Sequence, residues 1–149
     1  MRVVIQRVSQ ASVTVAEKKV GEISKGVLVL LGIQETDSQR EADWLAEKVA
    51  NLRIFEDEHG QMNHSLHEIG GEALVVSQFT LYGDAQKGRR PSYTQAARPE
   101  IAKPLYEYFA NKLHQLGVHT ETGKFQAMME VSLVNSGPVT IIIDKDFSS

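Results

Sequence analysis

The stretch Val27-Leu28-Val29-Leu30-Leu31-Gly32-Ile33 is short and apolar without interruption. Strands that are buried on both faces have this composition, whereas half-exposed strands alternate polar and apolar residues. We therefore expect residues 27–33 to form a central strand that is covered on both sides. Residues 73–82, Ala-Leu-Val-Val-Ser-Gln-Phe-Thr-Leu-Tyr, predict a second strong strand, which Gly83-Asp84 ends.

Strand patterns also surround these two segments. Residues 2–8 predict a first strand, and a hairpin follows around Glu17-Lys18-Lys19. The remaining expected strands are residues 12–15 and 20–23 in the hairpin and residues 118–122, 128–134 and 139–143 near the C-terminus. Residues 56–60 are typical of a turn.

Two segments have the spacing of amphipathic helices. In the first, Ser38 and Glu41 stand at capping-box spacing. Its expected apolar face consists of Ala42, Leu45, Val49 and Leu52, with Trp44 beside them. The second lies between Pro99 and Leu116, and Gly117 is placed to stop it. Because Pro104 cannot donate a backbone hydrogen bond, the regular helix can instead begin there. The apolar face expected for this helix consists of Ile101, Leu105, Tyr108 and Leu113.

These elements predict an α/β fold, a strand-rich single domain over residues 1–149 with two main helices over a mixed sheet or open β-barrel. A chain of 149 residues with 42% hydrophobic and 23% charged residues suits one domain. There is no cysteine, which excludes disulfides and thiolate chemistry and fits a reducing compartment. The N-terminus lacks the pattern of a signal peptide, and no apolar run approaches a membrane span, so we expect a cytoplasmic protein.

The net charge of −3 limits how this chain can contact nucleic acid. Proteins that grip phosphates over a wide surface are usually basic, so any RNA contact must be local. The candidate patch is the segment with Lys87, Arg89 and Arg90, and its ordinary alternative is a solvated loop.

Ser77-Gln78-Phe79-Thr80 is the first segment with chemical potential. It sets three hydrogen-bonding side chains at the end of an otherwise apolar strand. Strand alternation predicts Ser77 and Phe79 on one face and Gln78 and Thr80 on the other. An ordinary strand with Ser and Thr near a sheet edge explains the residues equally well.

Asn135-Ser136-Gly137-Pro138-Val139-Thr140 is the second such segment. A Gly-Pro pair between two strands requires a special backbone path, and a simple turn is the ordinary explanation. His64 and His67 have i, i+3 spacing but no evident third ligand, so no metal site is expected. We find no P-loop and no nucleophile elbow, and we expect no cofactor.

Taken together, the sequence resembles the D-aminoacyl-tRNA deacylase family over nearly its whole length. The order and spacing of the shared segments make the resemblance specific. Those segments are residues 6–8, 11–13, 26–32, 52–55, 62–63, 75–81, 90–92, 122–125, 131–135 and 137–140.

The resemblance implies a homodimer with two active sites at the interface. Ser77 to Thr80 would form the floor of each site, and the partner's Gly137-Pro138, joined by a cis bond, would reach into it. The substrate would be the ester of a D-amino acid with the terminal adenosine of tRNA. Glycine, including glycine mischarged on tRNA(Ala), would also be accepted because it has no side chain to exclude. Two backbone carbonyls near the substrate Cα would bind its ammonium group and leave no room for an L side chain.

The resemblance also assigns supporting roles. Arg7 would hydrogen-bond near the Gly-Pro turn and hold its orientation, and Asn135 would belong with Gly137, Pro138 and Arg7 to the group that binds the substrate and selects its chirality. The wall for the terminal adenine would consist of Phe125, Met129 and Gly123. Backbone N–H groups near Phe79 and Thr80 could stabilise the oxyanion. The 2′-hydroxyl of the terminal ribose would assist the attack, with Thr80 in a positioning role. Thr80 as a nucleophile is the alternative, although it would need a nearby base.

Two positions differ from common family forms. Gln126 stands where a glycine or alanine is frequent, and Ser136 replaces a frequent aspartate. Two other functions stay open. One is a related deacylase that clears another mischarged tRNA, and the other is a noncatalytic RNA-binding or assembly module, which the acidic balance disfavours.

Overall fold

The computed structural model describes residues 1–148, and its centre is a pair of parallel strands. Strand β3 (Gly26–Gly32) pairs with β6 (Glu72–Ser77), from Gly26 opposite Glu72 to Leu31 opposite Ser77. Both strands are covered on both faces, as the apolar run of residues 27–33 predicts for β3. Val27, Val29 and Leu31 pack in the cluster beneath the helices, whereas Leu28, Leu74 and Val76 pack in a smaller cluster on the other face.

Two long antiparallel strands extend this centre into a strongly curved sheet. Strand β1 (Arg2–Val15) pairs with β3 through residues 2–8 and with β2 (Lys18–Ile23) through residues 11–15. Its other edge pairs with β8 (Glu130–Asp144) over almost its whole length. Strand β7 (His119–Thr122) is parallel to β6 and ends the order β2-β1-β3-β6-β7.

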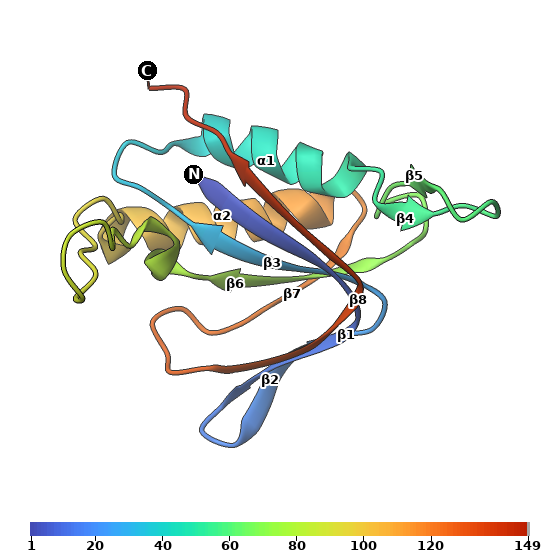
Figure 1. Ribbon diagram of the computed structural model, residues 1–149, viewed down its shortest axis with the longest axis horizontal. Coiled ribbons are helices and arrows are strands. Elements are labelled where there is room, and N and C mark those ends of the chain that lie inside the picture. The colour runs from blue at the N-terminus through green and yellow to red at the C-terminus, as the bar shows by residue number, and fades with distance from the viewer. Residues whose placement is uncertain (149) are drawn as a thin grey trace.

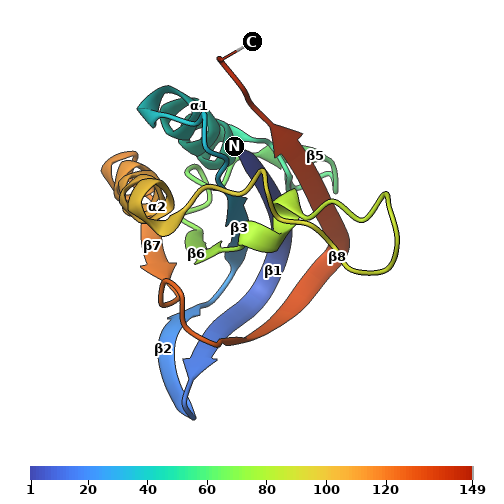
Figure 2. The same cartoon turned by 90° about the vertical axis from the view of Figure 1, so that its left-hand side faces the viewer.

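The curved sheet nearly closes into a barrel because β2 bends back towards β7 (Figures 1 and 2). Gly21 in β2 permits this approach, since a Cβ on it would lie only 2.5 Å from the carbonyl oxygen of Thr122. The expectation of a strand-rich α/β fold with an open barrel and two helices is confirmed.

Helices α1 (Gln39–Asn51) and α2 (Pro99–Gln115) lie side by side over one face of the sheet (Figure 1). The capping box of Ser38 and Glu41 is present. Helix α2 begins at Pro99, where the N–H that proline lacks would have no partner within the helix. The helix also includes Pro104. Its buried face was predicted only in part, because Ile101 and Tyr108 lie at its border. The buried side chains of α2 are Ala102, Leu105, Tyr106, Phe109, Ala110 and Leu113.

The structure corrects several expected boundaries. Residues 2–8 and 12–15 belong to one strand, and residues 130–144 form another that runs through the Gly-Pro pair without a turn. The register of the β1–β8 pairing shifts between Gln6 and Gln10. The Gly-Pro pair lies opposite this irregularity, which accommodates it without ending the strand. The short strands β4 (Phe55–Glu56) and β5 (Met62–His64) flank a turn at residues 57–60 and were not predicted.

The expected strand at residues 73–82 is also too long. Strand β6 ends at Ser77, and a short 3₁₀ helix η1 (Phe79–Tyr82) follows. The chain therefore leaves the sheet within the Ser77–Thr80 segment. None of the helices formed by residues 1–148 is long and apolar enough to cross a membrane.

Candidate active site

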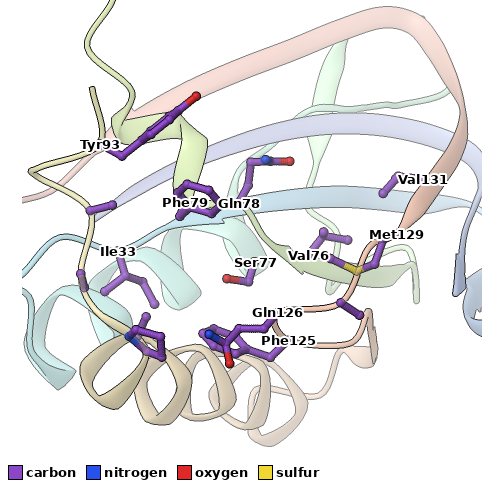
Figure 3. A pocket seen from close by; sticks show the side chains of 15 residues that line it. Ile33, Val76, Ser77, Gln78, Phe79, Tyr93, Phe125, Gln126, Met129 and Val131 are labelled. Atoms are coloured by element: carbon purple, nitrogen blue, oxygen red, sulfur yellow. The ribbon is translucent and has the colours of Figure 1, made fainter. Parts of the chain in front are cut away.

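A pocket of about 630 Å³ opens at the carboxyl end of β6. Ser77, Gln78 and Phe79 line one side of it, and Phe125 lies on the opposite side (Figure 3). Ala102 of α2 also lines it. The remaining lining residues are Ile33, Val76, Tyr93, Ala96, Ala97, Pro99, Gln126, Ala127, Met129 and Val131. The lining contains no Asp, Glu, His, Lys or Arg, so it offers hydrogen bonds and apolar contact but no charged side chain.

The backbone at the pocket floor is set by the change from strand to 3₁₀ helix. The N–H of Gln78 still donates to Leu31 O at 2.8 Å, as in a parallel ladder. The carbonyl of Gln78 then accepts from Leu81 N–H at 3.2 Å and starts the helix. Because the first N–H groups of a helix have no carbonyl of their own turn to bond, those of Phe79 and Thr80 are available to a ligand.

The four residues of this segment do not play equal parts. The predicted alternation of Ser77 and Phe79 against Gln78 and Thr80 is wrong, because η1 turns the chain after Gln78. Ser77, Gln78 and Phe79 line the pocket, whereas Thr80 does not. The Thr80 hydroxyl accepts a hydrogen bond from Gln78 Nε2 at 2.5 Å, and an amide N–H cannot serve as a base. Phe79 is 57% exposed and stands edge-on to Tyr93, with 5.2 Å between ring centroids.

The far wall is a tight loop between β7 and β8. Phe125 and Met129 line the pocket from this loop, and the ring of Phe125 contacts that of Tyr106 at a centroid distance of 5.7 Å. Gly123 lies behind them, and a Cβ on it would come within 2.7 Å of Met129 Sδ. Burial raises the pKa of Tyr106, whose hydroxyl donates to the carbonyl of Val75 at 3.3 Å, so this support of the wall stays protonated.

Gln126 adopts a left-handed backbone conformation, with φ of 63°. Residues with a Cβ are strained there, which gives a physical reason for the glycine frequent at this position in the family that the sequence resembles.

We expect Gln126→Gly to raise the free energy of unfolding by about 0.5–1 kcal/mol. Urea denaturation measures this. Gln126→Ala is the matched control, since it removes the side chain without relieving the backbone, and an equal gain from it would contradict the explanation.

The Gly137-Pro138 segment lies elsewhere on the molecule, on the exposed surface of β8. Its peptide bond is cis, and Gly137 has a φ of 134°. Arg7 anchors the segment from β1, donating from Nε to Ser136 O at 3.0 Å and from Nη1 to Ile54 O at 2.8 Å. Asn135 braces it from the other side, because its Oδ1 accepts from Val139 N–H at 3.1 Å. Ser136 contributes its carbonyl to this network.

Within one chain the Gly-Pro segment does not reach the pocket. Strands β1 and β3 lie between β8 and β6, and Gly137 stands near Arg7 while Ser77 is level with Val3. Arg7 and Gly137 line a separate hollow of about 410 Å³. The structure thus gathers the residues predicted for the site into two groups on one protomer.

The predicted basic patch lies on an exposed loop that starts close to the pocket. An isolated bridge between Asp84 and Ser92 closes the loop, and its residues include Lys87, Arg89 and Arg90. Tyr93, which lines the pocket, follows directly. In Figure 1 this loop projects beyond the end of β6.

Several pocket residues carried no sequence signal. Ala96, Ala97 and Ala127 are small residues in irregular segments, and only the tertiary structure brings them to the pocket. Ile33 had an indirect signal, since the carboxyl ends of parallel strands meet at one sheet edge. Of the two histidines singled out in the sequence, His64 has its Nδ1 3.7 Å from Glu68 Oε2, and His67 lies against Gly117. No cluster of three or more potential metal ligands is found among residues 1–148.

The family model described as D-Tyr-tRNA(Tyr) deacylase matches residues 4–144. The chain belongs to the D-Tyr-tRNA(Tyr) deacylase family. A relative named D-aminoacyl-tRNA deacylase from Roseiflexus sp. (strain RS-1) is 64% identical over 144 residues, which are 97% of this chain and 93% of that protein. The protein of the same name from Desulfatibacillum aliphaticivorans is 61% identical over 97% of this chain and 99% of its own length.

Solved structures share the deacylase fold of this chain. The c-Myc DNA Unwinding Element Binding Protein superimposes with a TM-score of 0.92 at 39% identity, covering 98% of this chain and 99% of its own. A probable eukaryotic D-amino acid tRNA deacylase superimposes with a TM-score of 0.86 at 20% identity, over 97% and 98% of the two chains, which shows a common fold.

Proposed function

We propose that this chain is a D-aminoacyl-tRNA deacylase, a hydrolase that cuts the ester between a D-amino acid and the terminal adenosine of tRNA. Relatives named for this activity match it over nearly its full length. The observation that carries the proposal is the uncharged pocket at Ser77–Phe79, lined by most of the residues that the family resemblance assigns to the ester and the adenine. We assign the protein to the cytoplasm, where aminoacyl-tRNA is used.

The pocket suits a terminal adenosine in size and lining. Its volume of about 630 Å³ lies within the range of small-molecule sites. Phe125 and Met129 give the adenine an apolar wall, and Gln126 adds an amide at its rim. The aminoacyl ester would then lie over Ser77 and Phe79, and the basic loop would meet the RNA backbone beside the pocket entrance.

In this proposal the active enzyme is a homodimer in which each protomer completes its partner's site. Strand β8 supports it, because its outer edge has no partner strand within residues 1–148 and its exposed side chains include Val134 and Ile142. An exposed strand with apolar side chains is a surface that a second copy commonly covers. The partner's Gly137-Pro138 would then face the Ser77–Phe79 pocket.

Chiral selection follows from which substituent of Cα meets the partner's main chain. The carbonyl oxygens of Gly137 and Pro138 would accept hydrogen bonds from the substrate ammonium group. An L side chain would point at these carbonyls and clash, whereas a D side chain would point to solvent. Glycine has no side chain and would be accepted too, so glycine mischarged on tRNA(Ala) is also a substrate in this proposal.

Hydrolysis requires that water attack the ester carbonyl carbon, that the bond to the ribose 3′-oxygen break and that this oxygen take up a proton. The N–H groups of Phe79 and Thr80 would stabilise the oxyanion that forms on the carbonyl. Because the lining holds no side-chain base, we assign the activation of water to the 2′-hydroxyl of the terminal ribose. The enzyme would therefore contribute position and electrostatic stabilisation.

The direct test compares D-tyrosyl-tRNA with L-tyrosyl-tRNA. We expect the purified protein to hydrolyse the D-ester at least about 100-fold faster, because a clash worth about 3 kcal/mol gives this ratio. Release of labelled tyrosine measures both rates. Equal rates would remove chiral selection, and a preference for other mischarged esters would favour a related deacylase.

The role of Thr80 is tested by Thr80→Ala. We expect the variant to retain more than about a tenth of the activity, because the Thr80 hydroxyl has no base beside it. Loss of a true nucleophile costs about 10⁴-fold or more. A loss of that size, in a variant that melts normally and still binds a non-hydrolysable amide analogue, would make Thr80 the nucleophile.

A further inference from the structure

A second groove of about 470 Å³ lies beyond the adenine wall, between α2 and β7. Phe125 lines both this groove and the pocket, so the two are neighbours across a single aromatic ring. The other residues of the groove are Lys103, Tyr106, Glu107, Ala110, Asn111, Thr122, Gly123 and Lys124.

Two cations frame this groove although the chain as a whole is acidic. Lys103 comes from α2 and Lys124 from the loop that carries Phe125, and both are exposed. Neither belongs to an ion pair of residues 1–148. The carbonyl of Lys124 accepts from Ala127 N–H at 3.2 Å, which fixes the loop at this residue. Unpaired lysines beside a pocket for a nucleotide favour binding of the phosphates of single-stranded nucleic acid.

The same groove carries groups that fit the edge of an amino-substituted base. Glu107 and Asn111 stand one helical turn apart on α2 and both line it. A carboxylate accepts a hydrogen bond from the exocyclic amino group of cytosine, and an amide can donate to its ring acceptors. Glu107 would repel a phosphate, so the groove is better suited to a phosphate at the lysines together with a base at Glu107.

We infer that this groove binds the nucleotide that precedes the terminal adenosine, with its linking phosphate at Lys103 and Lys124 and a cytosine base at Glu107 and Asn111. The inference rests on the proposed function, because the terminal adenosine in the adjoining pocket sets the direction in which the RNA strand leaves it. It explains how an acidic protein grips the end of an RNA by local contacts.

The experiment compares two small esters of D-tyrosine, one on the 3′-hydroxyl of adenosine and the other on the dinucleotide cytidylyl-adenosine. The wild-type protein should have the lower KM for the dinucleotide ester. The double variant Lys103→Ala/Lys124→Ala should raise the KM for the dinucleotide ester by about tenfold. The slope of log KM against log salt concentration for this ester should fall by about one. The KM for the adenosine ester should stay unchanged. Lys48→Ala on α1 is the matched control, since it removes one cation away from the groove and should change neither KM.

Further outcomes separate the inference from the proposed function. Replacing the cytosine with uracil, which lacks the amino group, should raise KM in the wild type but not in Glu107→Gln. Equal KM values for the two esters in the wild type, or an equal loss on both esters in the double variant, would overturn the second subsite. If neither D-ester were hydrolysed by the wild type, the proposed function itself would fail.

Discussion

Mixing two inactive variants of this chain should restore about a quarter of the wild-type activity, if each site takes the Gly-Pro segment from the partner. Ala127→Trp blocks the pocket of its own chain, because Ala127 lines it. Gly137→Ala disturbs the other group, because φ is 134° there and a Cβ would lie 2.9 Å from Val139 N and 3.1 Å from Arg7 Nη2. Each variant alone should lose about 100-fold or more, since small displacements at a reacting centre have this effect.

The recovered fraction follows from how the two defects are distributed. In a mixed dimer, one site would combine both defects and the other would have neither. Random exchange makes about half of the dimers mixed, and one of their two sites works, which gives about a quarter of the full activity. Co-expression with two different tags isolates the mixed dimer and allows the rate per dimer to be measured.

Two controls make the result decisive. A chain that carries both substitutions, mixed with the wild type, provides a mixed dimer in which each site has one defect, so that this dimer should be inactive. Thermal melting of each variant shows whether it is folded. If the mixture of folded single variants stayed as inactive as its components, or if the purified protein were monomeric at assay concentration, the shared site would be excluded.

The architecture could be predicted from the sequence where one physical pattern dominates. The unbroken apolar run in residues 27–33 and the capping box at Ser38 and Glu41 each have a single structural explanation, and both are confirmed. Ser77 and Gln78 could be singled out from the sequence as polar residues at the end of an apolar strand, and both line the pocket. That they form the active site stays a prediction.

Other features depend on distant contacts and escape local reasoning. The strand pattern of residues 73–82 continues through Phe79 and Thr80, but the chain turns into η1 after Gln78. Gly-Pro between two apolar runs is usual for a turn, yet β1 keeps residues 130–144 in one ladder along its edge. Ala96, Ala97 and Ala127 have no local pattern, because the segment before α2 and the loop after β7 come together only in the folded chain.

Arg7→Ala should lower kcat/KM for the D-ester by about 100-fold and the free energy of unfolding by about 3 kcal/mol. The side chain of Arg7 is nearly buried, and it links the carbonyls of Ile54 and Ser136. Its removal leaves two carbonyls without their donors and frees the Gly-Pro segment. Kinetic assays with urea denaturation measure both effects.

The ratio of D- to L-ester hydrolysis separates a positioning role for Arg7 from a purely structural one. If Arg7 holds the carbonyls that exclude an L side chain, the rate on the D-ester should fall while the rate on the L-ester holds or rises. Arg7→Lys should recover part of the stability but little of the selectivity, since an ammonium group lacks the planar fork that reaches two carbonyls at once. A variant that loses both rates in proportion to its folded fraction would show that Arg7 supports the fold alone, and chiral selection would then have to come from another part of the interface.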